Sequence, residues 1–133
     1  MPWLPGTNVW ICLLKNPGGK LEARVRAQPT HDVFLCSVVK AELWHGAEKY
    51  GNRERRMRAL DMLFGPFVSL PFEDEAARHY GEIRHRLEVQ SVVIGPNDLK
   101  IAAIARAHDL TIVTSNVDEF ARVPDLKTEN WER

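Results

Sequence analysis

The chain has 133 residues and a formal net charge of zero, because 18 Lys and Arg residues balance 18 Asp and Glu residues. Hydrophobic residues make up 44% and charged residues 27%, which are values typical of a soluble globular protein. This length suits a single core, and we therefore expect one domain over residues 1–133. The balanced charge excludes nucleic-acid binding through overall basicity, so such binding would need a local patch.

Targeting signals are not visible in the sequence. There is no apolar run long enough to cross a membrane. The first residues, MPWLPGTNVW, lack the basic segment and apolar stretch of a signal peptide. Cys12 and Cys36 lie in apolar surroundings outside any CxxC pair, and we interpret both as buried free thiols. These features together predict a cytoplasmic protein in a reducing compartment.

In the first half of the chain, apolar runs alternate with helical patterns. The helix after the second strand carries Ala41, Leu43 and Trp44 for the core, with Glu42 beside them. In chain order we expect an apolar segment from Trp3, a helix through 9–14 capped by Thr7 or Asn8, a helix at 20–27, a strand at 33–36, a helix at 38–50 capped by Ser37, and an arginine-rich helix at 53–63.

The same alternation continues in the second half. Gly95-Pro96 is a turn signal, Asn97 can cap the helix that follows, and Asp98 falls in its first turn, where the helix dipole favours a negative charge. We expect a strand at 67–70, a helix at 73–89 with a stripe of Ala76, Ala77, Tyr80, Ile83 and Leu87, a buried helix ending at His108-Asp109, a strand at 110–114, a helical turn at 117–122 with Phe120 inward, and an edge strand at 126–128.

Short apolar strands that alternate with helices predict an α/β fold with a parallel sheet covered on both faces. In such folds, ligands bind beyond the carboxyl ends of the strands. Polar residues follow the predicted strands at these ends, and Asp98 opens the helix that leads to the last of them. The polar residues are Thr7 and Asn8 after Gly6, Glu42 one turn into its helix, and Thr114, Ser115 and Asn116. Several oxygen ligands at one edge suit a hard cation such as Mg²⁺.

Each of these signals also has a purely structural interpretation. Glu42 could be a solvated helix residue, Asp98 a helix-start acid, and Asn116 a turn residue. Thr7 and Asn8 could serve only as caps. The basic helix that carries Arg53 and Arg56 could contact phosphates or form a solvated face. The sequence contains no HExxH, GxSxG or Walker-type motif, which argues against zincin, serine-hydrolase and P-loop functions.

Four blocks follow one another in the chain: GTNVWICLLKN, SVVKAELWHGAEK, LPFEDEAARHYGEIRHRLE and IGPNDLKIAAIARAHDLTIVTSNVDEFARVPDLKTENW. Together they resemble the PIN-domain toxins of bacterial VapBC toxin–antitoxin modules. The resemblance implies a three-layer α/β/α PIN fold with a short central parallel sheet of four to five strands. It also implies an endoribonuclease dependent on Mg²⁺ or Mn²⁺, a homodimer or higher toxin–antitoxin assembly, and a small VapB-type antitoxin that blocks the site.

The family's metal cluster implies catalytic roles for Glu42, Asp98 and Asn116, the last in its amide form. Thr7, Asn8 and Thr114 would support the cluster, and Arg53 and Arg56 would bind substrate RNA. The first acid of the family pattern, directly before Thr-Asn, is replaced here by Gly6. Pro5 is also unusual, because proline cannot donate to a sheet ladder, so we place it at the very end of its strand.

The missing carboxylate leaves the expected activity open. An inactivating substitution, a natural degenerate copy and a working variant all remain possible, and so do a non-catalytic PIN-fold binding module and a PIN nuclease of RNA processing. Glu119 and Asp118 are nearby acids, but we expect neither to replace the lost group. Trp10, Trp44 and Tyr50 exceed what the core needs, which predicts a two-fold dimer and a groove for an antitoxin segment.

Overall fold

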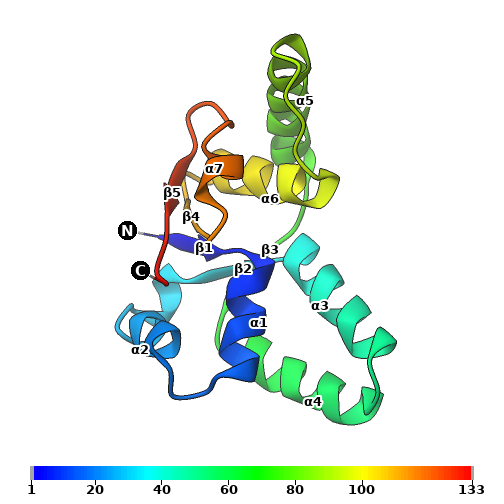
Figure 1. The fold of residues 1–133 in the computed structure, drawn as a ribbon, viewed down its shortest axis with the longest axis vertical. Helices are drawn as coiled ribbons and strands as arrows, with labels where there is room; N and C mark the ends of the chain where they lie inside the picture. The colour runs from blue at the N-terminus through cyan, green and yellow to red at the C-terminus, as the bar shows by residue number, and fades with distance from the viewer. Residues whose placement is uncertain (1, 133) are drawn as a thin grey trace.

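The computed structural model describes residues 2–132. Five short strands lie at its centre, with helices above and below them (Figure 1). The strands are β1 (Trp3–Pro5), β2 (Phe34–Cys36), β3 (Val68–Leu70), β4 (Thr111–Val113) and β5 (Lys127–Glu129). The helices are α1 (Thr7–Lys15), α2 (Lys20–Arg26), the 3₁₀ turn η1 (Thr30–Asp32), α3 (Ser37–Lys49), α4 (Arg53–Phe64), α5 (Asp74–Val89), α6 (Pro96–Ala107) and α7 (Val117–Phe120).

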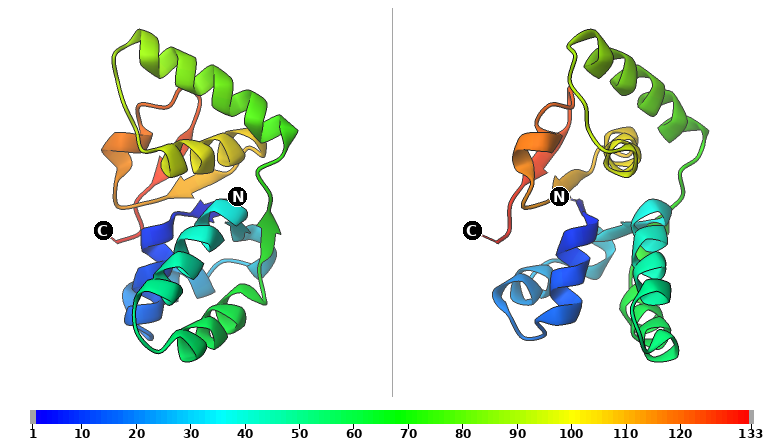
Figure 2. Two further views of the ribbon diagram at one scale, coloured as in Figure 1. Left: turned by 90° about the vertical axis from the view of Figure 1, so that its right-hand side faces the viewer. Right: turned by 45° about the vertical axis from the view of Figure 1, so that its right-hand side comes forward.

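All strand pairs are parallel: β1 with β4, β4 with β5, and β2 with β3. A parallel bridge between Trp3 and Val33 joins the two groups, which gives the order β3-β2-β1-β4-β5 with β5 at an edge. Helices α1 to α4 lie on one side of the strands, and α5 and α6 lie on the other, as the turned views also show (Figure 2). The predicted three-layer α/β/α arrangement with a short parallel sheet is confirmed.

The most deeply buried helix is α6, which packs against α5, α3 and β4. Its residues from Ile101 to Ala105 are all fully buried. Small side chains at three of these positions let the neighbouring elements approach closely, while Ile101 and Ile104 fill the space between them. Asp98 sits at the start of this helix, so the core itself holds the candidate ligand in place.

Three of the predicted helix caps are wrong. The residues at the N-cap positions of α1, α3 and α6 are Gly6, Cys36 and Gly95, and none of them makes a side-chain capping bond. Pro96 begins α6 in place of Asn97, because proline's fixed φ and missing N–H suit the first helical position. Thr7 and Ser37 are the first residues inside their helices, which frees the Thr7 hydroxyl for a contact across the molecule.

On α3, the predicted core positions are only partly right. The buried residues are Val39, Leu43 and Ala47, which repeat every fourth position and form one stripe. Ala41 lies two positions from Leu43, on the opposite side of the helix, and is exposed. Trp44 borders the stripe and is 40% exposed, with its ring packed edge-on against Phe64.

Two further expectations about burial are also corrected. Cys36 is buried, but Cys12 lies on the exposed side of α1. Ala77 of α5 is exposed, while Ala76, Ile83 and Leu87 form the buried stripe. No helix within residues 2–132 is both long enough and apolar enough to cross a membrane.

The end of β1 follows the expectation for Pro5. This proline is the last residue of the strand and pairs in register with Val113. The next residue, Gly6, supplies the amide that proline lacks and donates to the carbonyl oxygen of Val113 at 2.9 Å. The strand therefore ends beside β4, and the chain turns directly into α1.

Candidate active site

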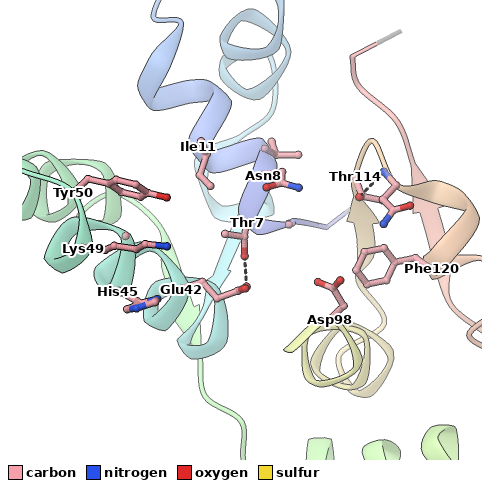
Figure 3. A pocket seen from close by; sticks show the side chains of 14 residues that line it. Thr7, Asn8, Ile11, Glu42, His45, Lys49, Tyr50, Asp98, Thr114 and Phe120 are labelled. Atoms are coloured by element: carbon pink, nitrogen blue, oxygen red, sulfur yellow. Dashed lines mark hydrogen bonds between the residues drawn. The ribbon is translucent and has the colours of Figure 1, made fainter. Parts of the chain in front are cut away.

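A cavity of about 400 Å³ opens at the carboxyl ends of β1, β2 and β4 (Figure 3). Most residues predicted to form the site line it, although they come from four separate stretches of the chain; Ser115 is not among the lining residues. The predicted residues that line the cavity are Gly6, Thr7, Asn8, Glu42, Asp98, Thr114 and Asn116. The remaining lining residues are Val9, Ile11, His45, Gly46, Lys49, Tyr50 and Phe120.

A hydrogen bond from Thr7 on α1 holds the carboxylate of Glu42 on α3. The hydroxyl of Thr7 donates to its Oε1 at 2.6 Å. Both residues are half-buried, and Figure 3 shows their side chains meeting between the two walls of the cavity. Because a hydroxyl occupies only one carboxylate oxygen, the other remains available to a ligand.

The pKa of Asp98 is unusually high for an acid at the start of a helix. Desolvation and the neighbouring charges of Glu119 and Glu42 raise the pKa of Asp98 from 3.8 to about 6. The helix dipole acts in the opposite direction, since it favours a negative charge at this position. Desolvation and the two neighbouring carboxylates thus both disfavour the charged form of Asp98, and a cation in the cavity would favour it.

Glu119, which the sequence analysis names only as a nearby acid that does not replace the lost group, lies beside the candidate ligands. Its carboxylate accepts hydrogen bonds from the side-chain amide of Asn116 and from the backbone N–H of Gly95, the latter at 3.3 Å. The proximity of Glu119 also contributes to the raised pKa of Asp98. Its spacing of three residues from Asn116 across a helix start is a signal that could have identified it.

Hydrogen bonds hold both the backbone and the side chain of Asn116. Its backbone N–H donates to Oγ1 of Thr114 at 2.9 Å, and its side-chain N–H group donates to Glu119. The side-chain carbonyl oxygen is therefore the atom left to meet a ligand. Thr114 is itself buried, so this short turn after β4 is held rigidly.

The backbone at Gly6 would accept a side chain. Gly6 has φ −72° and ψ 171°, which any L-residue can adopt. A Cβ atom built there would lie 3.6 Å from the carbonyl oxygen of Val113, an ordinary van der Waals contact. Steric or conformational need for glycine therefore does not account for its presence.

The two arginines assigned to substrate binding lie outside the cavity lining. Arg53 forms an ion pair with Glu48, and Nε of Arg56 donates to the carbonyl oxygen of Gly51 at 2.7 Å. The basic side chains that do reach the cavity are on α3, where His45 and Lys49 point into it (Figure 3).

The oxygen donors in the cavity suit a divalent ion whose coordination shell the protein fills only in part. Within residues 2–132, no three His, Cys, Asp or Glu side chains gather closely enough to hold a metal ion by themselves. Mg²⁺ commonly uses one or two carboxylates and completes its shell with water and phosphate oxygens. Glu42 and Asp98, with the amide oxygen of Asn116, match that pattern.

Comparison with known proteins agrees with this architecture. Residues 4–126 match the PIN domain family. The chain is 32% identical over 134 residues to "Ribonuclease VapC2" of Rickettsia felis, with all of both chains covered. It is 36% identical over 125 residues to "tRNA(fMet)-specific endonuclease VapC" of Shigella flexneri, with 94% of each chain covered.

A solved structure gives the same result for the fold. The toxin–antitoxin complex VapBC from Salmonella typhimurium, crystallised bound to DNA, contains a chain that superposes with a TM-score of 0.93 at 30% identity and 98% coverage of both chains. The fold, the order of the elements and the similarity along the whole length agree, and this chain therefore belongs to the PIN-domain family as a VapC-like toxin.

Proposed function

We propose that this chain is a metal-dependent endoribonuclease toxin that cleaves RNA phosphodiester bonds. The observation that carries the proposal is the meeting of Glu42 and Asp98 in one cavity at the carboxyl edge of the parallel sheet. The names of the relatives support the reaction class, because they are called ribonuclease and endonuclease. Mg²⁺ or Mn²⁺ is the proposed cofactor.

The proposed ligands of this ion are Glu42, Asp98 and the amide oxygen of Asn116. When bound, a divalent ion would activate a water molecule and stabilise negative charge on the phosphate. Thr7 keeps the Glu42 carboxylate oriented through its 2.6 Å hydrogen bond. The Thr114 hydroxyl holds the backbone of Asn116 in place, and Phe120 closes the same end of the cavity with an apolar ring.

We propose that Gly6 impairs this site. The family pattern has an acid at this position, and within residues 2–132 the carboxylates in the cavity lining are Glu42 and Asp98. A smaller negative charge should weaken the binding of the ion, and an ion displaced by about 1 Å can lower the rate about 100-fold. Gly6 is thus the specific observation that favours a second candidate function, a PIN-fold module that binds RNA or an antitoxin without cutting RNA.

A VapB-type antitoxin is the proposed protein partner. The Salmonella relative was solved as a VapBC complex, and several other solved relatives are also toxin–antitoxin complexes. Exposed apolar side chains on this chain, among them Leu14, Trp44 and Met62, are available for such an interface. Trp10, which the sequence analysis assigned to the same surface, is fully buried and cannot contribute. We also propose a homodimer within the toxin–antitoxin assembly.

The test is cleavage of single-stranded RNA by the purified chain in Mn²⁺, with Glu42→Gln and Asp98→Asn as matched variants. Metal-dependent cleavage that both variants abolish would support the endoribonuclease. Binding of RNA without cleavage, by this chain and by a Gly6→Asp variant alike, would support the non-catalytic module. Cleavage that persists in both variants and in EDTA would contradict the proposed site.

A further inference from the structure

The cavity has two walls of opposite character. Asp98 of α6 and Glu42 of α3 place acids on one side and in the middle of the cavity, whereas His45 and Lys49 of α3, with Tyr50 directly after that helix, lie on the other side (Figure 3). The chain has no net charge, so this is a local separation of charge rather than a consequence of composition. The carboxylates of Glu42 and Asp98, which form the acidic wall, would repel an anionic group of a ligand. The second wall, which carries Lys49, would attract that group.

The second wall is one face of a single helix. His45, Gly46 and Lys49 follow Glu42 at positions i+3, i+4 and i+7, which share a side of an α-helix. Gly46 leaves this face low, because a Cβ atom built there would meet nothing within 4 Å. The path from Glu42 to the end of α3 is therefore open and is bordered by the imidazole ring of His45 and the ammonium group of Lys49.

Tyr50 ends this path as an exposed aromatic ring. It is 56% exposed, although it lines the cavity. The ammonium group of Lys49 lies 5.5 Å from its ring centroid, and the guanidinium group of Arg56 lies 5.9 Å from it. An exposed ring with cations beside it is the arrangement that proteins use to hold single-stranded nucleic acid, with stacking for the base and positive charge for the backbone.

We propose that His45, Lys49 and Tyr50 form a nucleotide subsite, which binds the nucleotide adjacent to the phosphate that lies at Glu42 and Asp98. Lys49 contacts the backbone phosphate, Tyr50 stacks on the base, and His45 donates an N–H to an oxygen between them. This assignment rests on the proposed ribonuclease function and adds to it the direction in which the RNA strand leaves the acidic wall.

The arginines of α4 do not line the cavity themselves. Arg56 acts through Tyr50, whose ring it borders, and Arg53 is engaged by Glu48. A peptide segment of an antitoxin is the competing occupant of this wall. The pairing of an exposed ring with adjacent cations favours the nucleotide, because a base offers a π-face to the ring and its phosphate a charge to Lys49.

The experiment measures binding of a fluorescent single-stranded RNA in Mg²⁺ and uses an Asp98→Asn chain as the parent, so that the RNA stays intact. Tyr50→Ala should weaken binding by about 5- to 150-fold, whereas Tyr50→Phe should bind like the parent because it keeps the ring. Lys49→Ala should reduce the slope of log affinity against log salt by about 0.7, the value for one lost phosphate contact on a single strand.

Gly46→Leu is the sharpest variant. It adds a side chain to the open path whose Cβ atom would meet no neighbour within 4 Å, and leucine has a higher helix propensity than glycine. It should weaken RNA binding while the thermal unfolding temperature stays equal or rises. Arg55→Ala, an exposed arginine of α4 outside the cavity lining, is the matched control and should bind RNA like the parent.

The outcomes separate the subsite from the function on which it rests. Parent-like RNA binding by Tyr50→Ala, Lys49→Ala and Gly46→Leu, with RNA cleavage intact when the same changes are made in a Gly6→Asp chain, would overturn the subsite alone. Loss of affinity for an antitoxin segment with unchanged RNA binding would also overturn it and assign the wall to the antitoxin. Failure of both this chain and Gly6→Asp to bind or cut RNA would overturn the proposed function, and the subsite with it.

Discussion

The hydroxyl of Thr7 and the carboxylate of Glu42 form a 2.6 Å hydrogen bond across 35 positions of the sequence. This bond links the first turn of α1 to the helix that follows the neighbouring strand. It also fixes which way the Glu42 carboxylate faces in the cavity. Thr7 is therefore a positioning residue for the proposed metal site, even though its position after Gly6 first indicates a helix cap.

Replacing Thr7 tests this role. Thr7→Val keeps the shape of the side chain but removes the donor, so Glu42 should lose its fixed orientation. We expect metal affinity to fall by about 10- to 100-fold, as is usual when a partner of a metal ligand is removed. Isothermal titration with Mn²⁺ measures this change. Thr7→Ser keeps the hydroxyl and should stay near the original affinity, and equal losses in the two variants would contradict the positioning role.

Restoring an acid at Gly6 should strengthen the site. The backbone at Gly6 suits any L-residue, and the space around its Cβ is free of close contacts. Gly6→Asp adds a third carboxylate to the cavity beside Thr7. We expect a higher affinity for Mg²⁺ or Mn²⁺ and RNA cleavage raised by about 100-fold or more, with cell toxicity to match.

Two controls separate charge from shape in that experiment. Gly6 is the N-cap residue of α1, where Asp and Asn are both favoured. Gly6→Asn should therefore match the folding effect of Gly6→Asp without its gain in activity. Gly6→Asp combined with Asp98→Asn should be inactive again. Equal cleavage rates for this chain and Gly6→Asp would show that the first carboxylate is dispensable here.

The pKa of Asp98 predicts how stability depends on pH in the absence of metal. The folded state raises the pKa of Asp98 to about 6 from an ordinary value of 3.8, so the folded protein binds this proton more tightly than the unfolded chain does. The free energy of unfolding should therefore fall as the pH rises from about 4 to about 6 and then level off. Asp98→Asn removes the charge that causes this loss.

Asp98→Asn should consequently be more stable than the original chain at pH 7 to 8 in EDTA. We expect a gain of about 1–2 kcal/mol after allowance for the partial exposure of the group, and this gain should shrink toward pH 4. Urea denaturation at several pH values measures it. Addition of Mn²⁺ should reverse the order of stability, since the ion binds the carboxylate form only. A variant that is less stable at every pH would show that Asp98 is not electrostatically strained.

Arg106 should contribute more to stability than its neighbour Arg86, although both contact the same Oε1 atom of Glu82. The Arg106 side chain is only 8% exposed and also donates to His79 Nδ1 at 2.8 Å and to the carbonyl oxygen of Pro124. Arg106→Leu should lower the free energy of unfolding by about 1–3 kcal/mol, because it removes these bonds between α5, α6 and the loop after α7.

Arg86→Ala provides the comparison for that change. The Arg86 side chain is 51% exposed and pairs with Glu82 within the same helix, so its removal should cost about 0–0.5 kcal/mol. Thermal and chemical denaturation of the two variants side by side measures the difference. Similar losses for both would mean that the burial of Arg106 adds nothing to its bonds.

Much of the α/β pattern could be predicted from the sequence. Apolar runs such as 110–113 are short and bounded by polar or turn residues, and the buried character of α6 is visible in its run from Ile101 to Ala105. The carboxyl-edge rule for parallel sheets then brought Glu42, Asp98 and Asn116 to a common location. Their roles in metal binding and catalysis remain predictions.

The second wall of the cavity was also within reach of the sequence. Once Glu42 is assigned to a site on a helix, the 3.6-residue period places His45, Gly46 and Lys49 on the same face. The many arginines of α4 favoured the interpretation that this helix binds RNA. In the structure, Arg53 contacts Glu48 and Arg56 contacts Gly51, which are close to them in the chain. Whether these arginines make local contacts or reach the cavity depends on the conformation of the turn between α3 and α4.

The sequence by itself determined the local properties of this protein: which segments are apolar enough to form strands and buried helices, where turns occur, and that Gly6 stands where an acid would complete the pattern. Only the tertiary structure decided which polar groups meet. The Thr7–Glu42 bond, the Gly95–Glu119 bond and the raised pKa of Asp98 all depend on distances between segments that are remote in the chain. Electrostatic and hydrogen-bonding energies vary steeply with such distances, and no local pattern specifies them.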